Sequence, residues 1–129
     1  MSKAVGFIYS PEYGQYNFNP DHPFNMKRLD LTLEMLHATG LLQAEDIITA
    51  PEATIEELLC AHDREYIEVV KQMSAGGQIS PERGIGSEDT PAFPDMHRAS
   101  ALVVGGSLRG ARAVMEGEVD HAVNLAGGL

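Results

Sequence analysis

Three short apolar runs without regular polar alternation predict buried strands. They span residues 4–9, 46–50 and 121–126. Runs of this kind are typical of parallel strands whose two faces are both covered by helices. The third run leads directly into Gly127 and Gly128. In open α/β sheets, ligands bind beside the carboxyl ends of the strands, and glycine there allows close approach to the backbone.

The segments between these strands have apolar residues at helical spacing. The first helix is predicted by apolar residues at helical intervals, namely Met26, Leu29, Leu33 and Leu36. Asn25 can cap its start, and Gly40 can end it in a left-handed conformation. Thr54 and Glu57 form a capping-box pattern, in which each side chain binds a backbone amide at the start of a helix.

Two more helices follow along the chain. One begins at Asp63 and ends at the glycines 76 and 77, and the longest spans residues 95–116. Small residues at positions 106 and 110 of the longest helix would let it lie close against a sheet. The alternation of strands and helices predicts an α/β fold, with a parallel sheet between layers of helices.

Two long segments lack periodicity and contain many prolines and glycines. Residues 10–25 also contain aromatic residues, which favours a packed, functional loop over disorder, and residues 76–94 form the second loop. His22 lies in the first loop, where a hydrogen-bonded structural role is favoured over catalysis. Asp89 lies in the second and is a candidate carboxylate for holding a ligand.

Composition narrows the classes of partner. The chain has 19 acidic and 9 basic residues, a formal net charge of −10. Binding to nucleic-acid phosphates needs clustered Lys and Arg, so no nucleic-acid partner is expected. No apolar run approaches the roughly 20 residues of a membrane span, and no signal-peptide pattern occurs. We therefore expect a cytoplasmic protein without membrane contact.

Several common catalytic motifs are absent. Gly105, Gly106 and Gly110 lie in a helical pattern without dinucleotide-loop spacing, and neither a phosphate-binding loop nor a nucleophile elbow occurs. The five histidines show no paired metal-ligand spacing, so no metal site is expected within the chain. The single cysteine, Cys60, falls in an amphipathic helical pattern, which favours a core position.

Four ordered motifs resemble the histone deacetylase superfamily, most closely its bacterial branch, the acetoin utilization deacetylases. They are the segments 8–13, 21–28, 61–67 and 122–129. The resemblance implies an arginase-like parallel sheet with strand order 2-1-3 in this part. It also implies that residues 1–129 form the N-terminal portion, about one third, of a single deacetylase domain.

The resemblance further implies a zinc enzyme whose catalytic residues lie outside this chain. In the family, the Gly-Gly-Leu motif continues into a His-His pair that transfers protons. Two aspartates and a histidine further on bind zinc, and a later tyrosine polarises the acetyl carbonyl. We therefore expect no catalytic residue and no bound zinc in this chain, with zinc as the cofactor of the full-length parent.

The resemblance assigns supporting roles to six residues. Asp89 matches a rim aspartate that binds the substrate backbone, and Pro23 matches the loop beside the acyl-lysine tunnel. The wall of an internal cavity, through which acetate would leave, is matched by Tyr9, Arg28, Gly127 and Gly128. The family often has Asp-Cys-Pro where this chain has Asp89-Thr90-Pro91.

These observations together predict a zinc-dependent deacetylase that hydrolyses acetyl-lysine in a protein substrate, with this fragment alone inactive. Two alternatives stay open: a non-catalytic binding or scaffold module, and a related acetylpolyamine amidohydrolase. If strand 121–126 is interior in the parent sheet, the fragment exposes its edge. We therefore also expect the chain to self-associate, against the repulsion of its net charge.

Overall fold

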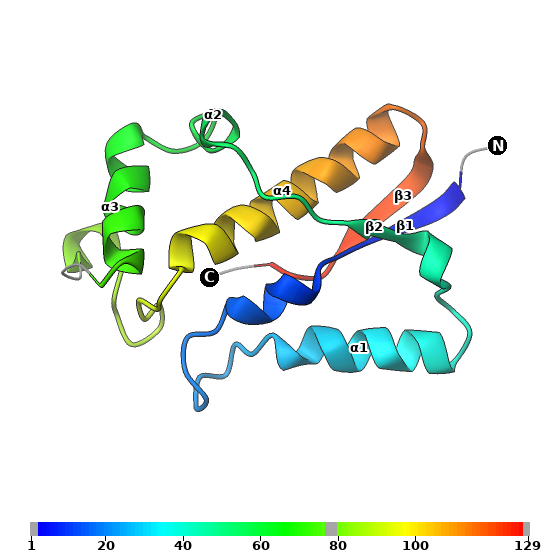
Figure 1. The fold of residues 1–129 in the computed structure, drawn as a ribbon, viewed down its shortest axis with the longest axis horizontal. Coiled ribbons are helices and arrows are strands. Elements are labelled where there is room, and N and C mark those ends of the chain that lie inside the picture. Colours follow the sequence, from blue (N-terminus) through cyan, green and yellow to red (C-terminus); the bar gives the residue numbers. More distant parts are fainter. Residues whose placement is uncertain (1–2, 77–79, 128–129) are drawn as a thin grey trace.

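The fold is a three-stranded sheet with helices on both faces (Figure 1). The computed structural model describes residues 3–76 and 80–127. Its strands and α-helices are β1 (Lys3–Tyr9), α1 (Lys27–Ala38), β2 (Ile47–Thr49), α2 (Ile55–Leu58), α3 (Arg64–Ser74), α4 (Met96–Met115) and β3 (Val119–Asn124). Short 3-10 helices are η1 (Pro11–Gln15), η2 (Ala44–Asp46) and η3 (Pro81–Arg83).

The sheet has the predicted topology. The strand order is β2-β1-β3, and β1 pairs in parallel with both neighbours. At its centre, Ile8 lies between Ile48 and Asn124. The predicted parallel α/β fold with strand order 2-1-3 is therefore confirmed.

The third strand is displaced from its predicted range of 121–126. It begins at Val119, because Gly117 adopts a φ of +71° and turns the chain from α4 straight into the sheet. It ends at Asn124, because the next two carbonyl groups accept hydrogen bonds from Arg28 instead of joining the sheet. The self-association predicted for its edge stays a prediction.

Helix α4 packs directly on one face of the sheet through its glycines. A Cβ atom on Gly110 would lie 3.3 Å from both Ala122 Cβ and Ile8 Cγ1. The close contact predicted for positions 106 and 110 is therefore confirmed. Tyr9 is adjacent to Ile8 and faces the opposite side of the sheet, where its hydroxyl donates to Asp30 of α1 at 2.8 Å. Helices α1 and α4 lie on opposite faces of the sheet (Figure 1).

A second glycine contact joins α4 to the segment that follows β2. A Cβ atom on Gly105 would overlap Pro51 O and lie 2.6 Å from Ala53 N. The same segment donates from Ala53 N to Ala101 O of α4 at 2.9 Å. The helix therefore contacts backbone, which cannot move aside as a flexible side chain could.

The predicted helix ends are largely present. Asn25 Oδ1 accepts from Lys27 N at 2.9 Å, and the Thr54–Glu57 capping box forms at the start of α2. Gly40, with a φ of +72°, ends α1 in a Schellman arrangement, in which Leu41 N donates to Leu36 O at 3.0 Å. Asp63 precedes α3, but its side chain makes no capping hydrogen bond.

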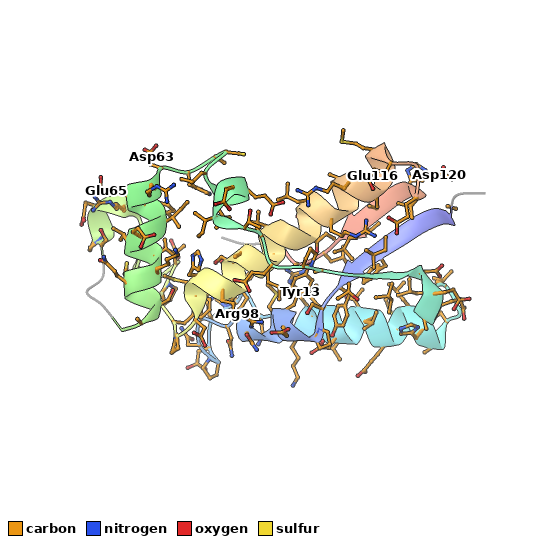
Figure 2. All side chains as sticks on the ribbon, turned by 45° about the horizontal axis from the view of Figure 1, so that its top comes forward. Tyr13, Asp63, Glu65, Arg98, Glu116 and Asp120 are labelled. Atoms are coloured by element: carbon orange, nitrogen blue, oxygen red, sulfur yellow. The ribbon has the colours of Figure 1, made fainter. Side chains whose placement is uncertain are left out.

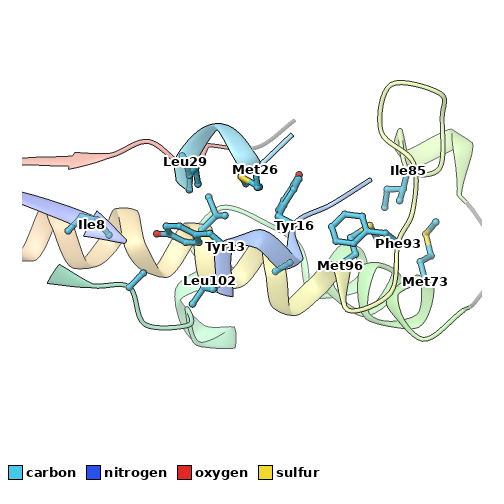
Figure 3. Packing of buried hydrophobic residues seen from close by; sticks show 14 residues of the cluster. Ile8, Tyr13, Tyr16, Met26, Leu29, Met73, Ile85, Phe93, Met96 and Leu102 are labelled. Atoms are coloured by element: carbon cyan, nitrogen blue, oxygen red, sulfur yellow. The ribbon is translucent and has the colours of Figure 1, made fainter. Parts of the chain in front are cut away.

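The core is a continuous strip from the sheet to the loops (Figure 3). In the loop region, Tyr16 packs against the rings of Phe18, Phe24 and Phe93 at centroid distances of 5.3–5.6 Å. Aromatic pairs at such distances add stability beyond the area that they bury. The first long loop is therefore packed, as its aromatic content predicts.

Charged side chains tie the loops to α4 on the outside. Arg98 lies beside η1 (Figure 2), where it donates to Gln15 Oε1 at 2.9 Å and forms ion pairs with Glu12 and Glu52. All of these groups are partly exposed, so each pair contributes little to stability by itself. Together they connect three segments at the first turn of α4.

One core assignment from the sequence is wrong. Cys60 is exposed and not part of the core. The amphipathic pattern extends through this position, but α2 ends at Leu58 and the chain then turns. Among the described residues, no helix is long and apolar enough to cross a membrane.

The glycine contact predicts a sharp difference between two substitutions. Gly105→Ala should lower the free energy of unfolding by about 2 kcal/mol or more, because the added methyl overlaps backbone and the cost exceeds the gain in helix propensity. Gly110→Ala should change the free energy of unfolding by less than about 1 kcal/mol. The added methyl makes tight contacts, whose cost is offset by the gain in helix propensity. Urea unfolding measures both, and equal effects would contradict the contact described.

Candidate functional site

The carboxyl end of β3 is held by a guanidinium group. Arg28 at the start of α1 donates from Nη1 to Leu125 O at 2.7 Å and from Nη2 to Ala126 O. Its guanidinium carbon lies 5.1 Å from the centroid of the Phe24 ring. Hydrogen bonds from a charged donor are stronger than neutral ones, and two in parallel also fix the orientation.

The glycine after this pair lies beside the same guanidinium. Gly127 has a φ of +57°, in the left-handed region that other residues seldom adopt. A Cβ atom placed on it would lie 4.0 Å from Arg28 Nη2. The structure therefore brings two of the predicted cavity residues together, while Gly128 lies outside the described residues.

Tyr9, the fourth predicted cavity residue, reaches the first turn of the same helix. Its hydroxyl donates to Asp30 Oδ1 at 2.8 Å, and its ring meets Tyr13 edge to face with centroids 6.2 Å apart. Desolvation by burial, with the neighbouring Asp30 carboxylate, raises the pKa of Tyr9 to about 12. The hydroxyl is thus a hydrogen-bond donor at neutral pH.

The two predicted rim residues are connected through a histidine. Phe24 N donates to His22 Nδ1 at 3.0 Å, so Nδ1 is the acceptor and the proton lies on Nε2. Nε2 then donates to the backbone carbonyl of Asp89 at 2.9 Å. This bridge joins the loop that contains Pro23 to the loop that contains Asp89.

The bridge leaves the Asp89 carboxylate available. Asp89 and Pro23 are both exposed, and His22 engages the main chain of Asp89. An exposed carboxylate on a loop held in place can accept hydrogen bonds from backbone N–H groups of a peptide. The structural role favoured for His22 from the sequence agrees with these contacts.

An apolar groove of about 550 Å³ lies between α3 and α4. Its lining includes Leu58, Ile67, Val104, Leu108 and Gly127. His62 stacks on Tyr66 at its side, with centroids 5.3 Å apart. The backbone beside Arg28 thus also borders a large apolar surface.

His97 also lines this groove. Burial, and secondarily the charge of Lys71, lower the pKa of His97 below its usual value. Both effects disfavour the imidazolium, so His97 is a neutral side chain at physiological pH. It therefore adds a polar but uncharged group to the groove.

Two residues of this region were not identified from the sequence. Tyr13 is buried, and its hydroxyl donates to Asn124 Oδ1 at 3.2 Å. Asn124 lies at the last position of β3. A polar amide inside an apolar strand was the available signal, since such a group needs partners when it is buried.

The described residues do not form a metal site. Among residues 3–76 and 80–127, no group of three or more His, Cys, Asp or Glu side chains is placed to hold a metal ion. A catalytic zinc needs about three protein ligands in one place.

The tyrosines predict a loss of stability in alkali. Burial raises the pKa of Tyr13, like that of Tyr9, from 10.0 to about 12. The folded chain keeps both protons up to about pH 12, while unfolded tyrosine ionises near pH 10. The two tyrosines therefore make their full contribution to the free energy of unfolding below pH 10, and this contribution is lost as the pH rises to 12.

Urea unfolding at several pH values from 9 to 12 measures this loss. The Tyr13→Phe variant should show a shallower fall in stability over the same range, because one of the two groups is removed. An identical slope in the variant would contradict the assignment to Tyr13.

Comparison with solved structures supports the fold. The chain superposes on an HDAC homolog from Aquifex aeolicus with a TM-score of 0.83 and 29% identity, covering 98% of this chain and 34% of that one. A crystal structure of an HDAC homolog complexed with SAHA matches with the same values.

Comparison of sequences gives the same result. The acetoin utilization protein AcuC of Bacillus subtilis is 45% identical over 126 residues, which cover 95% of this chain and 33% of that protein. The AcuC of Staphylococcus aureus strain MSSA476 is 39% identical over 131 residues, covering 99% and 34%. The chain thus spans about a third of the length of these curated relatives. The histone deacetylase domain model matches residues 22–129, and the chain therefore belongs to the histone deacetylase family.

Proposed function

We propose that this chain is the N-terminal part of a zinc-dependent deacetylase that hydrolyses acetyl-lysine in a protein substrate to lysine and acetate. In this proposal the chain supplies part of the substrate rim and of an internal cavity. The zinc ligands and the groups that transfer protons belong to the remainder of a longer cytoplasmic protein. The similarity to AcuC proteins about three times as long supports this division.

The observation that carries the proposal is the position of Arg28 beneath the backbone of residues 125–127. Arg28 binds the carbonyls of Leu125 and Ala126 at the carboxyl end of the sheet, where α/β folds bind ligands. A guanidinium in such a position attracts an anion as small as acetate. Gly127 leaves space for a small molecule to approach the backbone.

The rim contributes recognition of the peptide. The carboxylate of Asp89 would accept hydrogen bonds from the substrate backbone, and Pro23 would line the approach of the acyl-lysine side chain. His22 holds the two loops at a fixed separation. Orientation of a flexible peptide before reaction lowers the entropic part of the barrier.

The roles proposed for the rim and cavity residues do not include binding zinc. Among the described residues, no group of side chains fits a zinc site. In the proposed parent, zinc would polarise the amide and activate water. The residues described here bind, orient and exclude water around that centre.

A related acetylpolyamine amidohydrolase is the second candidate. The exposed carboxylate of Asp89 favours a cation as well as a peptide backbone, and the chain carries a net charge of −10. The two substrates are distinguished by comparing acetyl-lysine peptides with acetylated polyamines. A non-catalytic binding module is the third reading and predicts hydrolysis of neither.

The proposal predicts that deacetylase activity requires the region that lies beyond the matched segment in the AcuC relatives. Residues 1–129 alone should release no acetate from acetyl-lysine peptides. A chimera that joins residues 1–129 to the region of B. subtilis AcuC beyond its matched segment should release acetate, and zinc chelation should abolish this. An inactive chimera that is folded by circular dichroism would count against the proposal.

The rim assignment predicts an effect on substrate binding. In the chimera, Asp89→Ala should raise KM for an acetyl-lysine peptide about 10-fold with little change in kcat, since the lost bonds bind substrate and transition state alike. Glu88→Ala, which removes the neighbouring exposed carboxylate, is the matched control and should leave KM unchanged. If both substitutions raised KM equally, Asp89 would act only through the negative charge of the loop and not through specific hydrogen bonds.

A further inference from the structure

The Asn124 side chain uses all of its hydrogen-bonding capacity. Its Oδ1 accepts from Tyr13 Oη and from Ala126 N, both at 3.2 Å. Its Nδ2 donates to Ser107 Oγ at 3.0 Å and to Val103 O at 3.4 Å. A carboxamide has two donor hydrogens and two acceptor lone pairs, so all four are engaged.

These contacts also determine the orientation of the amide. Ala126 N can only donate and Val103 O can only accept, so exchange of Oδ1 and Nδ2 would break both bonds. One side chain thus joins the segment after β1, the helix α4 and the end of its own strand. A fully satisfied polar network favours a single arrangement of the groups that it connects.

The neighbouring glycine makes room for this network. A Cβ atom on Gly106 would overlap Tyr13 Oη and lie 3.1 Å from Asn124 Nδ2. Gly106 therefore does more than allow general helix packing, because its missing side chain is the space in which the hydroxyl reaches the amide.

The network acts on the same backbone as Arg28, but from the other side. Asn124 holds the N–H of Ala126, while Arg28 holds its carbonyl and that of Leu125. Ala126 is fully buried. Both polar groups of this residue are thus held by side chains, at the point where the chain leaves the sheet.

We infer that Asn124, supported by Tyr13, is a positioning residue for the deacetylation, setting the backbone of residues 125–127 through the amide of Ala126. The inference rests on the proposed function, in which this backbone borders the reacting region. A displacement of reacting groups by about 1 Å can reduce a rate about 100-fold. The bond from Oδ1 to Ala126 N is the contact that matters most.

Two substitutions separate this contact from the rest of the network. Asn124→Asp keeps the oxygen that accepts from Tyr13 and Ala126 and replaces Nδ2 with a second acceptor oxygen. It therefore loses the donation to Val103 O, while the Ser107 hydroxyl can donate to the new oxygen. Asn124→Leu has a similar size and loses all four bonds. Thr54→Ala removes the cap of α2, away from this network, and serves as a control with a stability loss of about 1 kcal/mol.

The first measurement is hydrogen exchange of the Ala126 amide in the 129-residue chain. Exchange should be at least 10-fold faster in Asn124→Leu than in the unsubstituted chain, and close to the unsubstituted rate in Asn124→Asp and Thr54→Ala. An unprotected Ala126 amide in the unsubstituted chain would overturn the inference, whether or not the proposed function holds.

The second measurement is steady-state kinetics in the AcuC chimera. Asn124→Leu should lower kcat about 10- to 100-fold with KM within about 3-fold, and Asn124→Asp should retain kcat within about 3-fold. Tyr13→Phe, which removes one bond, should give a smaller loss and remains informative if Asn124→Leu fails to fold. An unsubstituted chimera without activity would refute the proposed function and leave the exchange result to decide whether Asn124 holds this backbone.

A merely structural role makes a different prediction. In that case kcat would follow thermal stability across all variants, with Asn124→Asp and Thr54→Ala losing activity in proportion to their melting temperatures. That result, or an unchanged kcat in Asn124→Leu, would overturn the assignment.

Discussion

The structure depends on the close approach of α4 to the sheet and to the segment after β2. Gly105, Gly106 and Gly110 permit three different contacts: with backbone, with a hydrogen-bonded network and with apolar side chains of two strands. Glycine lowers helix propensity by about 1 kcal/mol at each position relative to alanine. That cost is offset by the packing of a helix near the sheet, because dispersion contacts are lost quickly as a gap opens.

This approach brings the carboxyl end of β3 within reach of side chains from three directions. Asn124 extends toward α4 and Tyr13, while Arg28 reaches the next two carbonyls from α1. The backbone therefore leaves the sheet along a defined path. Under the proposed function, such a path would fix a boundary of the site before any substrate is bound.

The two long loops are organised by a different interaction, the packing of aromatic rings. Tyr16, Phe18, Phe24 and Phe93 form a cluster that joins the loop after β1 to the loop before α4. His22 adds a directional bridge, with its tautomer set by Phe24 N. Loops of this length are usually mobile, and here the burial of aromatic rings holds the two loops together.

The sequence by itself determined the order of strands and helices, the parallel sheet and the family, because apolar periodicity, capping patterns and ordered motifs are local. Through the resemblance, it also predicted that Arg28 and Gly127 lie in the wall of one internal cavity. Only the tertiary structure decided that Asn124 is satisfied by partners as distant as Tyr13, that His22 connects to Asp89, and that Cys60 is exposed. These features depend on which segments meet across the fold, and no local pattern encodes the partner of a hydrogen bond more than a hundred residues away.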